Sequence, residues 1–222
     1  MTVNILRTAV TTALPVLLAA FALPAFAMPV NFTTTSEFCT GACITGSASL
    51  NITNSNGIVM LTTTGYAYTN VFPADVNLDP DGNPFDDKNA ATVTTHASGI
   101  APISLAGNEF LLTITQTSPV PGGTPISGSF LGQMSGTLGR SGTGAIVTFN
   151  TDSIALDNIT YSLDVPQTGP NAFQWYIPMP GNGLTGVTSL TMTVTPEPTF
   201  MMLTGLGFAG LAFIAYRRKR TV

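Results

Sequence analysis

Apolar and polar residues alternate in short runs through the middle of the chain, and this period of two predicts β-strands. The run at 109–117 is the clearest, because its even positions are large and mainly apolar while its odd positions are mainly threonine. Such a strand packs one face on a core and leaves the other to water. Similar runs, separated by turn-forming residues, occupy 46–53, 57–68, 92–100, 126–138, 144–150, 153–165, 172–178 and 187–195.

Nine short strands without a convincing helix predict an all-β domain, either a β-sandwich or a jelly roll. A barrel or a β-solenoid is the weaker alternative, and the chain has no fixed-period repeat of the kind that a solenoid needs. Glycine and proline recur throughout residues 28–195 instead of forming one linker. We therefore expect a single domain over 28–195.

Charge is distributed unevenly along the chain. Five of the seven basic residues lie in the terminal segments. The stretch 28–198 holds all eleven acidic residues but only Lys88 and Arg140 among the basic ones, so its formal charge is −9. Because nucleic acid is held by clustered lysine and arginine, we expect no nucleic-acid partner.

The first 27 residues have the organisation of a secretory signal peptide. Arg7 precedes an apolar run, and Ala25 and Ala27 provide the small-x-small pattern that signal peptidase accepts. Pro15 and Pro24 interrupt the run, which favours a cleaved signal over a membrane anchor or a buried helix. We expect signal peptidase to cleave after Ala27 and the remaining chain to be exported.

Export changes the interpretation of the two cysteines. In an oxidising compartment, Cys39 and Cys43 are expected to form a disulfide, since they stand four positions apart. Gly41, between them, provides the tight turn that this closure needs. A zinc site would require two further ligands, and His96 is the only histidine in the chain.

The end of the chain combines a rigid motif, an apolar run and a basic block. Pro196, Glu197 and Pro198 make a stiff, extended spacer, because proline cannot continue a helix or a central strand. Residues 200–216 carry no charge and span about 25 Å as a helix, near the lower limit for a bilayer core of about 30 Å. The basic block at 217–220 would hold that end in the cytoplasm.

This order of features over roughly the last 27 residues (196–222) resembles the PEP-CTERM sorting domain. The resemblance implies that an exosortase, a membrane-embedded processing enzyme, recognises Pro196, Glu197 and Pro198. It also implies that the helix and basic tail are removed or exchanged during delivery to the surface of a Gram-negative bacterium that makes extracellular polysaccharide or biofilm. The alternative is an ordinary single-pass anchor behind a proline linker.

One acidic stretch, 75–87, has the composition of a cation-binding loop. Ca²⁺ prefers oxygen ligands, and an Asp or Asn at every second position before Gly82 matches the first half of a calcium loop. Lys88 stands where an EF-hand has its bidentate glutamate, which argues against an EF-hand. A Ca²⁺ site and a solvated turn both stay open. The calcium interpretation uses Asn77, Asp79, Asp81, Asn83, Asp86 and Asp87 as ligands.

Catalytic patterns are weaker. A Ser-His-Asp arrangement would need His96, but no Gly-x-Ser-x-Gly turn is present, and we interpret His96 as a strand-surface residue. Pairs of carboxylates suited to glycoside hydrolysis can be drawn from Glu109, Asp152, Asp157 and Asp164, although eleven acidic residues make such pairs easy to assemble. We therefore expect no enzyme activity.

Neighbouring aromatic residues suggest contact with sugars. Trp175 and Tyr176 offer ring faces for stacking, and alternation places them on opposite sides of a strand. The competing interpretation makes Trp175 a core residue, and burial decides between the two.

These patterns predict an exported structural or adhesive β-domain of the cell surface or extracellular matrix, first anchored in the inner membrane with a cytoplasmic C-terminus. A Ca²⁺-assisted carbohydrate-binding module, with extracellular polysaccharide as its partner, is the alternative. A secreted hydrolase is the third.

Overall fold

A computed structural model shows that the chain forms an all-β domain, as the sequence predicted. The structure describes residues 29–41, 43, 46–54, 57–71, 88–98, 102–139, 142–179, 185–196 and 207. The chain forms two units, one from Met28–Thr195, here called the β-domain, and one from Met1–Ala27 with Pro196–Val222. Of the second unit, only Pro196 and Gly207 are described.

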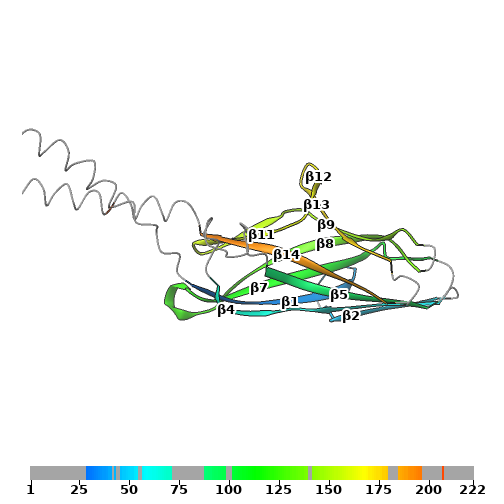
Figure 1. Ribbon diagram of the computed structural model, residues 1–222, viewed down its shortest axis with the longest axis horizontal. Coiled ribbons are helices and arrows are strands. Elements are labelled where there is room, and N and C mark those ends of the chain that lie inside the picture. Colours follow the sequence, from blue (N-terminus) through cyan, green and yellow to red (C-terminus); the bar gives the residue numbers. More distant parts are fainter. Residues whose placement is uncertain are drawn as a thin grey trace, which may run out of the picture. The chain divides into compact units, whose positions relative to one another are not determined.

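The strands form two antiparallel sheets (Figure 1). Sheet A has the order β12 (Gln167–Gly169), β13 (Ala172–Ile177), β9 (Gly144–Phe149), β8 (Ile126–Leu138), β7 (Asn108–Ser118), β1 (Val30–Thr40), β4 (Ala67–Val71), and β6 (Ile103–Ser104) also pairs with β8. Sheet B has the order β10 (Ser153–Leu156), β11 (Ile159–Leu163), β14 (Thr185–Pro196), β5 (Lys88–Ser98), β3 (Gly57–Thr64), β2 (Ser49–Asn54).

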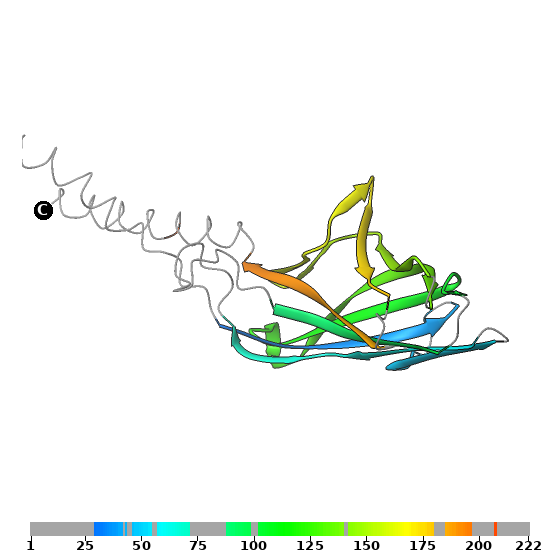
Figure 2. The ribbon, with the colours of Figure 1, turned by 45° about the vertical axis from the view of Figure 1, so that its right-hand side comes forward.

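The two sheets lie face to face and enclose one hydrophobic core, which makes the fold β-sandwich-like (Figure 2). Strand β7 shows how the pattern becomes structure: Phe110, Leu112 and Ile114 point inward and have no exposed area. The intervening residues are partly exposed on the outer face of sheet A. The period of two in this run therefore identified the alternation correctly.

Strand length differs between the centre and the edges of each sheet. The edge strands β12, β4, β10 and β2 have 3, 5, 4 and 6 residues. The central strands β7, β8, β5 and β14 have 11, 13, 11 and 12. Because an unpaired edge is a template for pairing with another chain, short edges limit uncontrolled association.

Strands β3 and β4 connect the two sheets along β1. The chain leaves sheet B at the end of β3 and enters sheet A at the start of β4, with two residues between the strands. The first of them, Gly65, lies against the backbone of Thr34, and a Cβ at this position would lie 2.0 Å from the Thr34 carbonyl oxygen. The Thr34 amide donates to the Tyr66 carbonyl at 2.7 Å. Farther along β1, Phe38 and Ser47 exchange two backbone hydrogen bonds of 2.7 and 3.0 Å. Both sheets are therefore tied to β1.

Strand β14 is the last strand in the described residues but lies in the middle of sheet B, between β11 and β5. The pair β10-β11 and the trio β5-β3-β2 meet in this sheet only through it. Its inner side chains Leu190, Met192 and Val194 are 1%, 0% and 4% exposed. Strand β14 thus completes both the sheet and the core.

A buried polar contact links the sheets near the start of β1. The Tyr161 hydroxyl of β11 donates to Oε1 of Gln116 in β7 at 2.9 Å, and Gln116 Nε2 donates to the Pro119 carbonyl. The Phe32 ring meets Tyr161 edge-on, with centroids 5.3 Å apart. The amide and the hydroxyl are buried but hydrogen-bonded, as buried polar groups must be. Burial raises the pKa of Tyr161 well above its ordinary value.

The structure also contains strands that the pattern did not predict. Strand β1 was missed because several of its inward positions are polar, including Thr34 and Ser36. The Ser36 hydroxyl is 2.6 Å from the hydroxyl of Thr63, which satisfies both groups. The runs at 57–68 and 153–165 each prove to be two strands, and β6 and β12 are too short for a periodic signal.

Two valines of β14 allow a matched test of its packing. Val194→Ala is expected to lower the free energy of unfolding by about 2 kcal/mol, because it removes two buried methyl groups from the core. Val187 is 62% exposed on the same strand, so Val187→Ala should change stability by less than about 0.5 kcal/mol. Urea denaturation of both variants measures the difference, and equal effects would contradict the placement of β14.

Tyr161 predicts a loss of stability at high pH. The raised pKa means that the unfolded chain releases the tyrosine proton first, so the stabilisation is complete below pH about 10 and decreases above it, at up to about 1.4 kcal/mol per pH unit. Desolvation, followed by the nearby Tyr66, also raises the pKa of Tyr68, which adds to the slope.

Urea denaturation between pH 8 and 11 measures this effect. The variant Tyr161→Phe should show a shallower decline than the parent. If Tyr161→Phe loses stability with pH as steeply as the parent, ionisation of Tyr161 is not the cause of the loss.

Candidate functional site

The predicted calcium ligands at 77–87 lie outside the described residues, between β4 and β5. The described residues on either side of this segment are Val71 and Lys88. Val71 pairs with Val30 at the start of β1, and Lys88 pairs with Met192 near the end of β14. In the described part of the chain, no group of three histidine, cysteine, aspartate or glutamate side chains could hold a metal ion. The Ca²⁺ interpretation stays a prediction.

The targeting segments are described only at Pro196 and Gly207. Ala25, Ala27, Glu197 and Pro198 lie outside the described residues, whereas Pro196 is the last residue of β14. Within the residues that the structure describes, no helix has the length and hydropathy of a membrane span. The predicted span at 200–216 lies outside them except for Gly207.

Cys39 and Cys43 form the disulfide that their spacing predicted, with Cα atoms 5.1 Å apart. The turn between them contains Gly41 at φ +77°, a conformation that glycine adopts without strain. The Gly41 amide donates to the Gly107 carbonyl at 3.1 Å. The disulfide turn at the end of β1 is therefore attached to the turn that precedes β7.

The disulfide turn also orients a carboxylate at the start of β7. The Cys43 backbone amide donates to Oε2 of Glu109 at 3.0 Å. Gln133 Nε2, on the neighbouring strand β8, donates to Glu109 Oε1 at 2.6 Å. Both carboxylate oxygens thus have a donor, and the side chain is held in one orientation on the outer face of sheet A.

Four polar side chains lie in one row across this face. Glu109 pairs with Gln133, Gln133 with Thr148, and Thr148 with Gln174, on β7, β8, β9 and β13. With strands spaced by about 4.8 Å, the row is roughly 14 Å long. We call these four residues the outer row. The amide and hydroxyl groups of the row can both donate and accept hydrogen bonds, and the Glu109 carboxylate accepts them.

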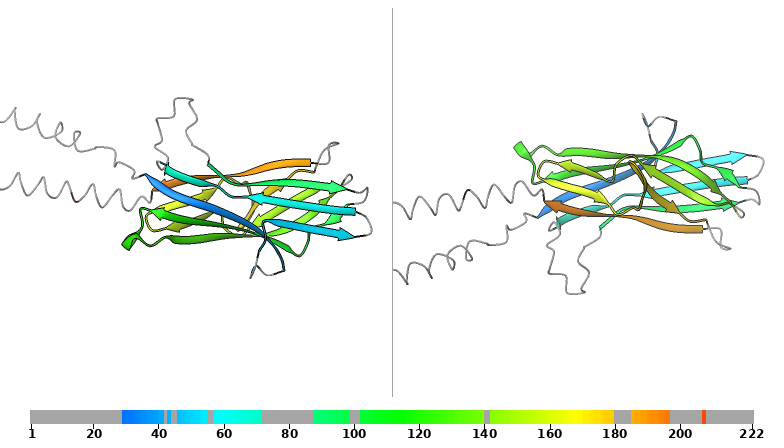
Figure 3. Two further views of the ribbon diagram at one scale, coloured as in Figure 1. Left: turned by 90° about the horizontal axis from the view of Figure 1, so that it is seen from below. Right: turned by 90° about the horizontal axis from the view of Figure 1, so that it is seen from above.

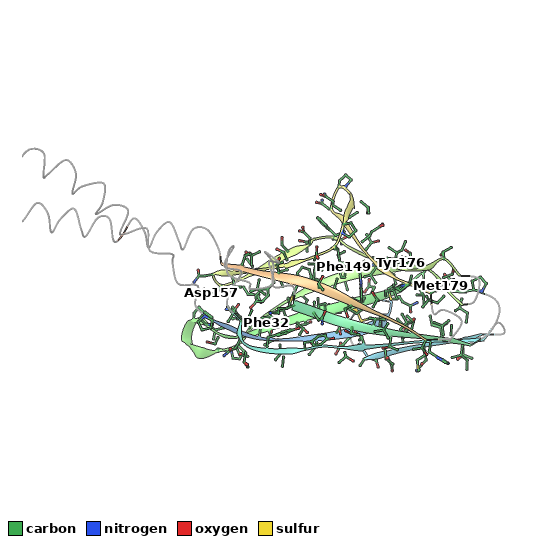
Figure 4. All side chains as sticks on the ribbon, in the orientation of Figure 1. Phe32, Phe149, Asp157, Tyr176 and Met179 are labelled. Atoms are coloured by element: carbon green, nitrogen blue, oxygen red, sulfur yellow. A yellow bond between two sulfur atoms is a disulfide. The ribbon has the colours of Figure 1, made fainter. Side chains whose placement is uncertain are left out.

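Apolar side chains flank the outer row on both sides. Leu111 and Leu131 pair on one side, and Leu131 is 41% exposed. Ile146 and Tyr176 pair on the other. Tyr176 is 53% exposed, and its hydroxyl donates to the Thr143 carbonyl at 3.1 Å, which holds the ring in place; it can be located in Figure 4.

Hydroxyl groups cover the outer face beyond the leucine pair. Thr113 and Ser129 are hydrogen-bonded across β7 and β8 at 2.9 Å, and Thr115 and Ser127 at 2.8 Å. These four groups satisfy one another in pairs. The outer row differs from them because it combines a fixed carboxylate with two amides.

Trp175 belongs to the core and corrects the sugar-stacking hypothesis. It is 6% exposed on the inner face of β13, with its ring centroid 5.5 Å from that of Phe110. A buried ring cannot stack on a glycan, so the glycan contact does not hold for Trp175 and the competing core interpretation does. Tyr176, the next residue, points to the other face and is exposed, as alternation requires.

The other catalytic candidates show no assembled site in the described residues. His96 lies on β5 with Met60 and Thr185 as its register neighbours, and neither is a carboxylate or serine. Asp164 accepts a hydrogen bond from the Thr191 hydroxyl at 3.3 Å, next to sheet B. Glu109 lies on sheet A. The interpretation of His96 as a strand residue is in keeping with this position.

Removal of the disulfide is expected to lower stability moderately. Because the sequence separation is 4, the chain-entropy model gives about 2 kcal/mol for the double variant Cys39→Ser and Cys43→Ser. Urea denaturation should show this loss, and reductant should destabilise the parent but not the double variant. An unchanged midpoint in both experiments would mean that the turn is held without the disulfide.

The outer row could not be found from sequence, because its members come from four strands and meet only through the register. The one partial signal was the exposed aromatic at Tyr176. Comparison with models of protein families, with curated protein sequences and with solved structures found no match for this chain.

Proposed function

We propose that this protein is exported and delivered to the cell surface or extracellular matrix, where a single β-sandwich or jelly-roll-like domain has a structural or adhesive role. The observation that supports it best is the position of the ends of the β-domain relative to its polar face. Strand β1 begins and β14 ends at the same end of the β-domain (Figure 3). The disulfide turn lies at the other end of β1.

This arrangement suits a tethered domain. Pro196 is at once the last residue of β14 and the first of the Pro-Glu-Pro motif, so the motif follows the fold without a linker. A tether at this end would leave the disulfide turn and the outer row pointing away from the membrane. The hydroxyl-rich face of sheet A would then be free to meet matrix components.

The delivery route in this proposal has three steps. Signal peptidase cleaves after Ala27, the helix at 200–216 halts in the inner membrane with its basic end in the cytoplasm, and an exosortase processes the chain at Pro196, Glu197 and Pro198. The proposal assigns no enzymatic activity to the β-domain.

A carbohydrate-binding module, assisted by Ca²⁺ at 77–87, is the second candidate. The observation that favours it is the exposed and fixed ring of Tyr176 beside the outer row. Tyrosine offers an apolar face to a sugar ring while its hydroxyl stays hydrogen-bonded.

Loss of the motif should block delivery. In a Gram-negative host that has an exosortase, the parent chain should reach the surface fraction without residues of the basic tail, as measured by mass spectrometry. Glu197→Ala should remain in the membrane fraction with its C-terminal segment intact. Glu37→Ala, the same change at a half-buried strand position, should behave as the parent.

A strain without the exosortase gives the second control, and there the parent should also stay in the membrane fraction. Surface delivery of Glu197→Ala with a processed end, or of the parent with an intact tail, would overturn the proposed route.

A further inference from the structure

We propose that the outer row is the binding site for a neutral polysaccharide, with one extended chain lying across β7, β8, β9 and β13. This inference rests on the proposed surface role and names the ligand class of the adhesive face. Its support comes from the arrangement of four side chains and of the apolar groups beside them.

The polar chemistry of the row fits sugar hydroxyls. An amide offers a donor and an acceptor on one planar group, so it can bind two neighbouring hydroxyls together. Gln133 and Gln174 supply two such groups, with the Thr148 hydroxyl between them in register. Glu109 adds an acceptor, and its orientation is set by Gln133 Nε2 and the Cys43 amide. Glu109 and Gln133 are therefore preorganised, which lowers the entropic cost of binding.

The apolar side chains explain why the ligand is a sugar rather than a protein. A protein interface has an apolar centre and a polar rim. Here the order is reversed, because the polar row lies between Leu131 on one side and Tyr176 on the other, both exposed. A sugar has hydroxyl edges and C–H faces, so its edges can meet the row while its faces contact the flanking groups.

The charge of sheet A explains why the polysaccharide is neutral. The described strands of sheet A contain no lysine or arginine. Glu109 places a negative charge at one end of the row, which would repel carboxylate or sulfate groups on an anionic glycan. A neutral polysaccharide is not repelled by Glu109.

The disulfide gains a role in this site. It closes the turn that carries the Cys43 amide, and that amide donates to Glu109. Without the closure, Glu109 keeps only its bond from Gln133. We therefore expect the loss of the disulfide to weaken binding even where the domain stays folded.

Affinity electrophoresis in native gels tests the proposal. The full chain, in a detergent without a sugar headgroup, is run through gels that contain glucan, mannan, galactan or the anionic alginate, each with Ca²⁺ and with chelator. At least one neutral polysaccharide should retard the parent. The double variant Gln133→Ala with Gln174→Ala should bind about tenfold more weakly, because it loses two planar hydrogen-bonding groups.

Matched variants separate the site from general effects. Gln167→Ala makes the same change at an exposed position outside the row and should bind as the parent. Tyr176→Ala and the double cysteine variant should both weaken binding, with thermal melting used to confirm that each is folded. If the parent is retarded equally in Ca²⁺ and in chelator, the outer row binds the polysaccharide without a Ca²⁺ ion at 77–87.

Three results would overturn the inference: no retardation by any neutral polysaccharide, stronger retardation by alginate, or unchanged binding by the double glutamine variant. These outcomes do not depend on surface delivery, which the Glu197→Ala experiment measures. A protein that reaches the surface but binds no neutral polysaccharide would refute this inference alone.

Discussion

The insertion of β14 between β5 and β11 is the interaction on which the rest of the structure depends. Without it, sheet B would consist of two separate parts, and Leu190, Met192 and Val194 would leave a gap in the core. Because β14 is the last strand of the β-domain, this non-local pairing can form only when the whole β-domain is available. Pro196 then ends the strand and is the first residue of the predicted sorting motif.

The same period of two that builds the core also builds the outer face. On β13, Trp175 fills the core and the next residue, Tyr176, lies exposed beside the outer row. A shift of register by one residue would move Trp175 to the outer face and Tyr176 into the core, and would disrupt both the core and the outer row. The antiparallel pairing of β13 with β9 fixes this register over five residue pairs. The geometry of the outer row is thus a direct consequence of the packing on the other side of the sheet.

Local features of the fold were readable from the sequence, and non-local ones were not. Alternation in 109–117 identified β7, and the spacing of Cys39 and Cys43 identified the disulfide, because each depends on neighbouring residues only. Strand β1 was missed, since Thr34 and Ser36 are buried through hydrogen bonds instead of apolar surface. Alternation separated Trp175 from Tyr176 but did not say which side was the core. The outer row depends on the register of four strands, which no single segment encodes.

The position of the disulfide follows from these constraints. Closing a loop this small contributes about 2 kcal/mol, and a disulfide that served stability alone could close a longer loop with more effect. This one closes a short turn whose amide donates to Glu109, at the end of β1 away from Val30. Since β14 ends at the end of the β-domain where β1 begins (Figure 3), the proposed tether would leave the disulfide turn at the far end.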